Sequence, residues 1–440
     1  MIQKSRLLYQ QLSHQRLRYR ALKAAFSAVF RAFFIVGLHF GTCGLKAQPL
    51  TFYRDIQPIL LRHCAPCHQP GQVGPFSLLR YEEVEKRATF IKKVVSARYM
   101  PPWLADPSFQ TYHNQRILSE ADIQKIVDWV DQGKKEGKAS KGMDIADFLK
   151  DSLRLPQPNL TLEMNQAFVI PGNNTEQYRM FVIPTNLPED VYVRGIEFVP
   201  GNRRLAHHAR IMVDTTRLLR EDDGLDVGPS AEFDEKNVKV YDSFWQGWVP
   251  GNTPAFYPEG MAKKLPKQSD LVINMHYSPS PVEATDRSKI RLYLAPTPPK
   301  HTVKSFVLGE NWITNLPFFL PANTVNTFYM RSPMTPVHFR LLSVLPHMHK
   351  LGKSFKAYAI TPDGDLVPLV KIDRWDFNWQ TTYQFVQPLD LPKGSVIYAE
   401  AVFDNTAANP ENPSFPPKDV TYGWGTNNEM MNLIVEYVEK

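Results

Sequence analysis

The chain has 440 residues, of which 43% are hydrophobic and 22% charged, a composition that excludes both a disordered chain and a membrane-embedded one. Its formal net charge of +7 is local, because residues 1–47 hold eight basic residues and no acidic residue. The rest of the chain is close to neutral, so we expect no nucleic-acid partner. The length indicates two or three domains.

Residues 1–47 have the features of an export signal. A basic segment ends at Arg31, a short apolar run follows, and small residues lead to Ala47. This order is typical of a cleaved signal peptide, and the apolar run is shorter than the roughly 20 residues of a membrane span. We therefore expect an extracytoplasmic, periplasmic protein with no membrane span in the mature chain. Lipidation of Cys43 is the less favoured alternative, since the residues before it match the lipoprotein pattern poorly.

The cysteines beyond this segment are Cys64 and Cys67, and His68 follows directly. Two cysteines are too few for a four-cysteine zinc site or an iron–sulfur cluster. A redox dithiol and a covalently attached c-type haem remain, and the histidine after the second cysteine favours haem. In that reading the two thiols bind the two vinyl groups at one porphyrin edge, and the imidazole of His68 binds the iron.

Met100 is the best candidate for the second axial ligand of this haem, because a thioether raises the potential of an electron-transfer iron. The prolines that follow it, Pro101 and Pro102, cannot continue a helix and favour a stiff loop. Weaker candidates for this ligand are His63, His113 and Met143.

Helical patterns flank this loop. The sequence predicts one helix over residues 81–97 and a second that is capped by Ser119 and ends near Gly133. The haem motif, the methionine and the closing helix, in this order, resemble a small cytochrome c over residues 50–137. The resemblance implies an all-α domain carrying one haem c.

Beyond residue 157 the pattern changes to short runs rich in Val, Ile, Tyr and Phe between turn residues, which is typical of β-sandwich domains. Such runs lie at residues 191–199, 205–213, 271–277, 290–294, 339–345, 395–403 and 432–438. We therefore expect a multidomain chain, with a small all-α cytochrome c domain followed by two all-β antiparallel sandwich domains. The expected divisions are a signal peptide (1–47), a cytochrome c domain (48–140), a linker (141–157), a first β domain (158–300) and a second β domain (301–440).

Five histidines of the β region form a pattern. His347 and His349 alternate, so on a strand they share one face about 7 Å apart and can bind one ion. His207 and His208 are adjacent and face opposite ways unless a strand end or a bulge turns them together. One buried and one exposed histidine is the alternative for this adjacent pair. His276 follows as a single histidine.

Further motifs accompany these histidines. Residues 351–353 (Leu-Gly-Lys) follow His349, Met430 lies near the C-terminus, and residues 248–251 (Trp-Val-Pro-Gly) precede His276. The order of these motifs over residues 157–440 resembles the copper type II, ascorbate-dependent monooxygenases, the family of peptidylglycine α-hydroxylating monooxygenase and dopamine β-monooxygenase.

The resemblance implies jelly-roll-like β domains and two copper ions, each with its own ligands. The electron-transfer copper would be bound by His207, His208 and His276. The catalytic copper, where oxygen binds, would be bound by His347, His349 and Met430. The thioether in the second set favours Cu(I), the state that must react with oxygen.

The sequence also departs from the family. Leu345 and Ile434 stand where the peptide-hydroxylating member has the arginine and tyrosine that bind a substrate carboxylate, so peptide-amide chemistry is not expected. Asn432 matches a polar family position. No cysteines remain for the family's disulfides.

Together these features predict an exported copper monooxygenase that hydroxylates a C–H bond of a small organic substrate with O2. An external electron donor would supply electrons through the fused haem to the first copper. The alternative is a non-catalytic haem and copper protein that transfers electrons or binds copper. A zinc protein is less favoured, because a thioether is a poor zinc ligand.

Overall fold

The computed structural model describes residues 48–113, 115–139, 145, 155–228, 238, 240–252 and 254–440. The predicted signal peptide with Cys43, and most of the predicted linker with Met143, lie outside these residues. Residues 50–440 form one compact unit. Among the described residues, no helix has the length and apolar character needed to cross a membrane.

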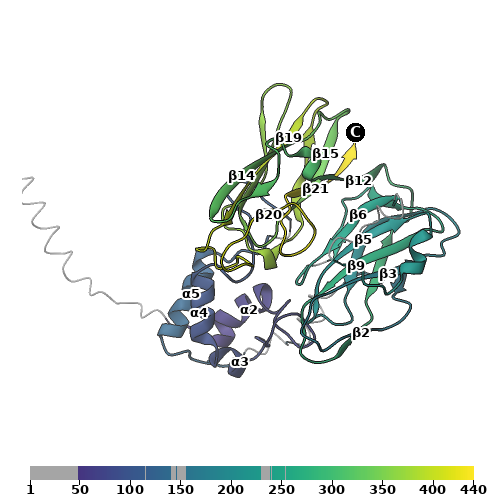
Figure 1. The fold of residues 1–440 in the computed structure, drawn as a ribbon. Helices are drawn as coiled ribbons and strands as arrows, with labels where there is room; N and C mark the ends of the chain where they lie inside the picture. The colour runs from purple at the N-terminus through teal and green to yellow at the C-terminus, as the bar shows by residue number, and fades with distance from the viewer. Residues whose placement is uncertain are drawn as a thin grey trace, which may run out of the picture. The chain divides into compact units, whose positions relative to one another are not determined.

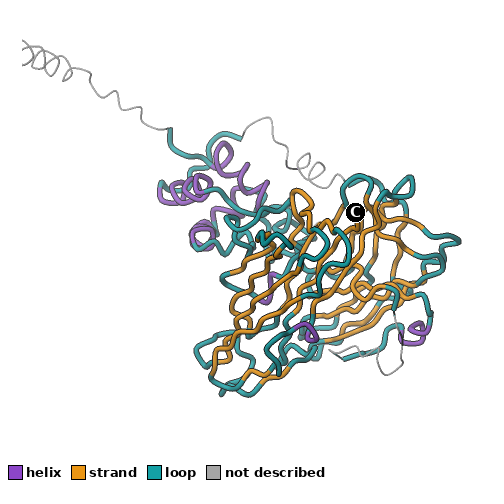
Figure 2. Tube along the Cα trace, turned by 90° about the horizontal axis from the view of Figure 1, so that it is seen from above, coloured by secondary structure: helices purple, strands orange, loops and turns teal. Residues whose placement is uncertain are grey.

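The prediction of a small all-α cytochrome c domain is wrong, because the protein is mostly β-sandwich with few helices. Figure 2 shows that strands make up much more of the described chain than helices do. The longer helical elements are η1 (Phe52–Ile56), α2 (Gln57–His63), α3 (Tyr81–Glu85), α4 (Ala88–Ser96) and α5 (Glu120–Asp131). Short 3-10 turns also lie in the described part of the β region, namely η2 (Leu218–Asp222), η4 (Glu310–Trp312) and η5 (Phe377–Trp379).

Both predicted helical segments are present, and the first of them is interrupted. The helix expected over residues 81–97 is divided into α3 and α4, and Arg87 Nη1 at the break donates to the carbonyl of Glu83 at 3.0 Å. This bond satisfies a carbonyl that a continuous helix would use internally. The capped helix is confirmed as α5, since Ser119 accepts from the amide of Asp122, and Gly133 follows with a φ of +90°.

The stretch between α4 and α5 is not part of a separate helical domain. Ala105 and Tyr112 are buried in the hydrophobic core of the C-terminal sandwich, at 2% and 3% exposure. Tyr112 forms a β-bridge with Phe385, and its hydroxyl donates to the carbonyl of Leu369 at 2.8 Å. Burial of these residues in a core more than 200 positions away joins the helical segment to the β structure.

All seven predicted strands are present, with ends within two residues of those expected. The first sandwich contains β1 (Leu160–Glu163), β2 (Phe168–Ile170), β3 (Gln177–Pro184), β4 (Val191–Val199), β5 (Ala206–Asp214), β6 (Asp242–Trp248), β7 (Ala255–Phe256), β8 (Met261–Leu265), β9 (Asp270–Tyr277), β10 (Ala284–Asp286) and β11 (Lys289–Leu294). The second contains β12 (His301–Leu308), β13 (Phe319–Leu320), β14 (Thr324–Arg331), β15 (Phe339–His347), β16 (Gly352–Ile360), β17 (Leu366–Ile372), β18 (Tyr383–Leu391), β19 (Val396–Asn405), β20 (Val420–Thr421) and β21 (Asn432–Glu439).

One sheet runs through both sandwiches. Its strand order is β1-β11-β4-β8-β12-β21-β15-β18, with β7 paired to β4. The parallel pair of β8 and β12 joins the two halves. A four-stranded sheet, β3-β9-β5-β6, faces the first half, and another, β14-β19-β16-β17, faces the second. Figure 1 shows β6, β5, β9 and β3 as neighbours in the first of these sheets.

The packing of Tyr112 generates a prediction about stability. Tyr112→Ala should lower the free energy of unfolding of the β structure by about 3–5 kcal/mol, the usual cost of removing a large buried aromatic side chain. Tyr112→Phe, which loses only the hydrogen bond to Leu369, should cost about 1 kcal/mol. Denaturant unfolding followed by circular dichroism measures both.

Tyr99→Ala is the matched control, since Tyr99 is 44% exposed. If Tyr112→Ala left the unfolding of the β structure unchanged, the segment would not be part of the C-terminal core.

Candidate metal centres

Three histidines converge at one end of the sheet β3-β9-β5-β6. The pairing of β5 with β9 shifts in register here, because Ala206 pairs with Tyr277 while His208 pairs with His276. His207 is the extra residue of this β-bulge. A bulge is the feature that two adjacent histidines need in order to face one point, and it is present.

The nitrogen atoms of these histidines form a compact cluster. One ring nitrogen from each of His207, His208 and His276 lies within 4.8 Å of the other two. The Nδ1 atoms of His207 and His208 are 3.2 Å apart. Both ring nitrogens of His276 are buried without a hydrogen-bond partner. Such unsatisfied buried nitrogens are costly unless another group, such as a metal ion, takes their lone pair.

The cluster keeps its imidazoles neutral. Burial, followed by the charge of His207, lowers the pKa of His276 to about 3. Burial also lowers the pKa of His207 below its ordinary value and that of His208 well below it. Neutral imidazole is the form that binds a metal, so the site is ready to bind one at neutral pH.

The ring of Tyr178 stacks on the ring of His276. The two residues are paired across β3 and β9, and their rings stack at 4.3 Å between centroids with 8° between planes. The hydroxyl of Tyr178 lies 2.9 Å from Glu176 Oε2 and 2.8 Å from Thr426 Oγ1. Because Thr426 lies in the loop before Met430, this tyrosine links the first cluster to the second.

The second group of predicted ligands lies where β15 and β21 meet. His347 is the last residue of β15 and pairs with Asn432, the first residue of β21. His349 lies two residues past the strand end, and its ring centroid is 5.0 Å from that of His347. Met430 precedes β21 and is 2% exposed. Met431, beside it, packs in the hydrophobic core.

Each histidine of this group donates its Nδ1 hydrogen to an oxygen. His347 Nδ1 donates to Gln380 Oε1 at 2.6 Å, and His349 Nδ1 donates to the carbonyl of Asn428 at 3.0 Å. Both Nε2 lone pairs therefore stay available for a metal. Burial, with the charges of His349 and Arg210, lowers the pKa of His347 to about 3, against the opposing bond from Gln380. Burial likewise lowers the pKa of His349.

The carboxylate of Glu429 ties the two ligand segments together, and sequence reasoning missed it. Its Oε2 accepts from the amides of His349 at 2.9 Å and Met430 at 3.1 Å, and its Oε1 accepts from the amide of Leu351 at 2.6 Å. Glu429 is fully buried. Burial raises the pKa of Glu429 to about 8, although the three amide donors oppose this shift.

The two groups lie close to each other. The ring of Phe377 is 5.6 Å from that of His207 and 6.0 Å from that of His349, between centroids. The charge of His349 also contributes to lowering the pKa of His276. Residues 373–381 thus contact both clusters, and no motif in the sequence marked this loop.

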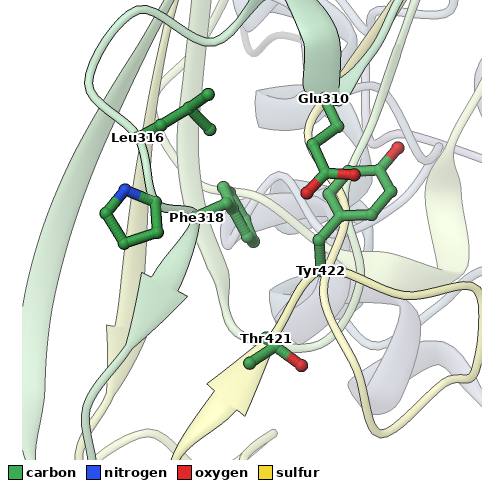
Figure 3. Close-up of a pocket in the computed structure, with 6 residues that line it drawn as sticks. Glu310, Leu316, Phe318, Thr421 and Tyr422 are labelled. Atoms are coloured by element: carbon green, nitrogen blue, oxygen red, sulfur yellow. The ribbon is translucent and has the colours of Figure 1, made fainter.

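A surface pocket of about 620 Å³ lies near the second group. Figure 3 shows its wall, which is formed by Glu310, Leu316, Pro317, Phe318, Thr421 and Tyr422. The hydroxyl of Tyr422 donates to Asn432 Oδ1 at 3.1 Å, and Asn432 Nδ2 lies 3.8 Å from the sulfur of Met430. A short hydrogen-bonded chain therefore joins the pocket to Met430. Leu345 and Ile434 face each other across β15 and β21.

The Cys-x-x-Cys-His segment lies at the end of α2. Burial raises the pKa of Cys64 to about 12, and burial also raises that of Cys67. A reactive dithiol needs a lowered thiol pKa, so the redox reading is disfavoured. His68 Nδ1 donates to the carbonyl of Phe76 at 3.1 Å, which leaves its Nε2 lone pair free to bind iron.

Met100 lines a cavity of about 420 Å³ together with Trp103, Arg116 and Trp379. Among the described residues, the wall of this cavity does not include His68 or either cysteine of the motif. Arg116 lies close to Cys67, since its charge partly opposes the rise in the pKa of Cys67, and its Nη1 donates to the carbonyl of Gly251 at 3.1 Å. Arg116 thus lies next to Cys67 and also lines the cavity that contains Met100.

The weaker candidates for the axial ligand have other surroundings. His63 ends α2 and is half-buried. His113 is exposed, and its amide donates to the carbonyl of Gln384 at 2.8 Å.

The donor sets of the two histidine groups fit copper, since neutral imidazoles and a thioether bind it well. The free thiols and the oriented imidazole of His68 fit a c-type haem.

Comparison with known families gives a match in the C-terminal part of the chain. Residues 324–440 match the family model of the copper type II ascorbate-dependent monooxygenase, C-terminal domain. This segment contains His347, His349 and Met430, and it supports the resemblance to that family. At the level of the family it supports a copper-dependent oxidoreductase that acts on a substrate with O2. It does not extend to the first cluster or to the cysteine motif.

Comparison with curated proteins gives no match. Among solved structures, the chain is similar to the major capsid protein P2 from bacteriophage PM2, with 10% identity, a TM-score of 0.25 and coverage of 64% of this chain and 97% of that one. It is also similar to a peptide-N(4)-(N-acetyl-β-D-glucosaminyl) asparagine amidase, with 8% identity, a TM-score of 0.29 and coverage of 64% and 96%. At these TM-scores neither likeness carries an argument.

The low pKa of His276 predicts how the metal-free protein responds to acid. The unfolded chain binds a proton at His276 near pH 6.5, whereas the folded chain binds it only near pH 3. The contribution of neutral His276 to the free energy of unfolding is therefore fully present above pH 6.5. It is lost as the pH falls toward 3, by about 1.4 kcal/mol per pH unit for one such site.

The free energy of unfolding of metal-free protein, measured between pH 7 and pH 4, should fall less steeply in His276→Ala than in the unchanged chain. His113→Ala, at an exposed position, is the control and should keep the original slope. Equal slopes for the unchanged chain and His276→Ala would contradict the prediction.

Proposed function

We propose that this protein is an exported copper-dependent monooxygenase that hydroxylates a C–H bond of an organic substrate with O2. The observation that carries the proposal is the pair of neighbouring histidine groups, each with neutral, buried imidazoles and with Phe377 between them. The family match over residues 324–440 supports the same reading. We further propose that a c-type haem, attached at Cys64 and Cys67 with His68 as iron ligand, is its electron supply.

Each of the two groups would bind one copper ion. His207, His208 and His276 would hold a copper with three imidazoles, a set that accommodates both Cu(I) and Cu(II) and suits electron transfer. His347, His349 and Met430 would hold the second copper, and their softer set favours the reduced state. Copper bound in these sites supplies one-electron redox chemistry and the activation of O2.

The protein itself contributes burial and orientation. The pKa values of His276 and His347, both lowered to about 3, keep these imidazoles unprotonated and free to bind a metal. Hydrogen bonds from the Nδ1 atoms of His347 and His349 fix the direction of the Nε2 lone pairs. The pocket beside Tyr422 is the place where we propose that the substrate approaches, because Asn432 joins it to Met430.

Metal analysis combined with oxygen uptake tests this function. The full chain should bind two copper ions, His276→Ala should lose one, and His347→Ala should lose the other. Oxygen uptake by the reduced, copper-loaded protein should rise with a suitable organic substrate and give hydroxylated product, and both variants should lose that product.

His113→Ala, outside both groups, should keep both metals and full product yield. Binding of a single copper by the unchanged chain, or loss of both from either variant, would contradict two independent sites. Two bound coppers with no rise in oxygen uptake for any substrate would favour a non-catalytic electron-transfer protein.

The haem is tested separately. Protein made with the c-type haem maturation machinery should carry one covalently bound haem that stays attached through denaturation and acid extraction. Met100→Ala should remove any sulfur-to-iron absorption band and leave the attachment intact, whereas His63→Ala should leave both. Release of the haem on acid extraction would show that the assignment of Cys64 and Cys67 is wrong.

A further inference from the structure

The loop between β17 and β18 contacts three of the five histidines, His207, His347 and His349. Trp375, Phe377 and Gln380 lie within six consecutive residues of this loop. Each of them contacts a histidine through its side chain. This concentration of contacts on one short segment suggests that the loop positions the histidines.

Gln380 determines which ring nitrogen of His347 is available. Its Nε2 donates to the carbonyl of Phe377 at 3.0 Å, which sets the orientation of the side-chain amide. Its Oε1 consequently faces His347 Nδ1, at 2.6 Å, and can only accept. The hydrogen of His347 must then lie on Nδ1, and the lone pair lies on Nε2.

Trp375 holds the backbone of the second histidine. Its indole Nε1 donates to the carbonyl of His349 at 3.1 Å. The ring reaches this carbonyl by packing on Gly352, where an added Cβ would lie 2.7 Å from Trp375 Cδ1. This close approach explains why the Leu-Gly-Lys turn needs glycine at that position.

Phe377 lies between the two groups. Its ring centroid is 5.6 Å from that of His207 and 6.0 Å from that of His349. The side chain of Thr381, just after the loop's last contact, donates to Asn252 Oδ1 of the first sandwich at 3.0 Å. The loop is therefore attached on both sides, and its three contacts are held in one arrangement.

We propose that Gln380 is a positioning residue of the second copper site, which acts by holding His347 in the tautomer and orientation that present Nε2 to the metal. Trp375 and Phe377 hold the rest of the loop in place for this contact. The proposal rests on the proposed function, because it concerns the site of His347, His349 and Met430. It adds a residue from outside the ligand set.

Copper binding at the second site alone provides the test. Gln380→Leu and Gln380→Glu are introduced into the full chain carrying His276→Ala, so that the second site is measured by itself. Gln380→Leu removes the acceptor for Nδ1 and should weaken copper binding roughly 10–100-fold, the usual cost of losing such a partner. The electron paramagnetic resonance spectrum of its Cu(II) should also change.

Gln380→Glu keeps an oxygen acceptor and should restore binding to within a few-fold of the parent, with the parent's spectrum. Gln384→Leu is the matched control, since Gln384 is a half-buried glutamine of the adjoining strand that donates to the carbonyl of Phe256 at 3.0 Å. It should bind copper as the parent does.

Three results would overturn the proposal. Unchanged affinity and spectrum in Gln380→Leu, with copper bound normally by the parent, would refute the role of Gln380 and leave the proposed function standing. Equal losses in Gln380→Leu and Gln384→Leu would show a general effect on the fold instead of a positioning role. A parent that binds no copper at the second site would refute the proposed function and this role with it.

Discussion

The second histidine group depends on one buried carboxyl group, that of Glu429. Glu429 accepts from the amides of His349, Leu351 and Met430, and the amides of His349 and Met430 share a single oxygen, Oε2. Two segments 80 residues apart in the chain are thereby fixed to the same atom. Without this carboxylate, three buried amides would lose their acceptor, at a cost of about 1–3 kcal/mol each. The backbone segments that carry the thioether of Met430 and the imidazole of His349 would then no longer be held together by a shared hydrogen-bond acceptor.

The first group depends on a different device, an irregularity in a sheet. The bulge at His207 turns two adjacent histidines toward His276, which a regular strand cannot do. The two devices are joined through Tyr178, which stacks on His276 and reaches Thr426 in the loop that leads to Glu429. The second group lies on β15 and β21 of the sheet that runs through both sandwiches, whereas the first lies on the sheet β3-β9-β5-β6 that faces it.

The sequence predicted the strands and the histidine pattern well, since both follow from local periodicity and spacing. It could state the condition for His207 and His208, a bulge, but not that the bulge forms, because register depends on the partner strand. It missed Glu429 and Gln380, whose roles arise from contacts between distant segments. The predicted all-α domain failed for the same reason, because the burial of Tyr112 in a distant core leaves no local pattern.

In the metal-free protein, the burial of His276 lowers the stability of the fold. Both nitrogens of His276 are buried without a hydrogen-bond partner, and burial keeps the pKa of His276 near 3, so a proton cannot compensate them at neutral pH. A bound cation would satisfy the lone pair and would stabilise the folded chain by mass action, since the unfolded chain does not present the same cluster. Metal binding would thus offset the cost of burying His276 without a hydrogen-bond partner, so the geometry of the cluster itself supports a bound ion.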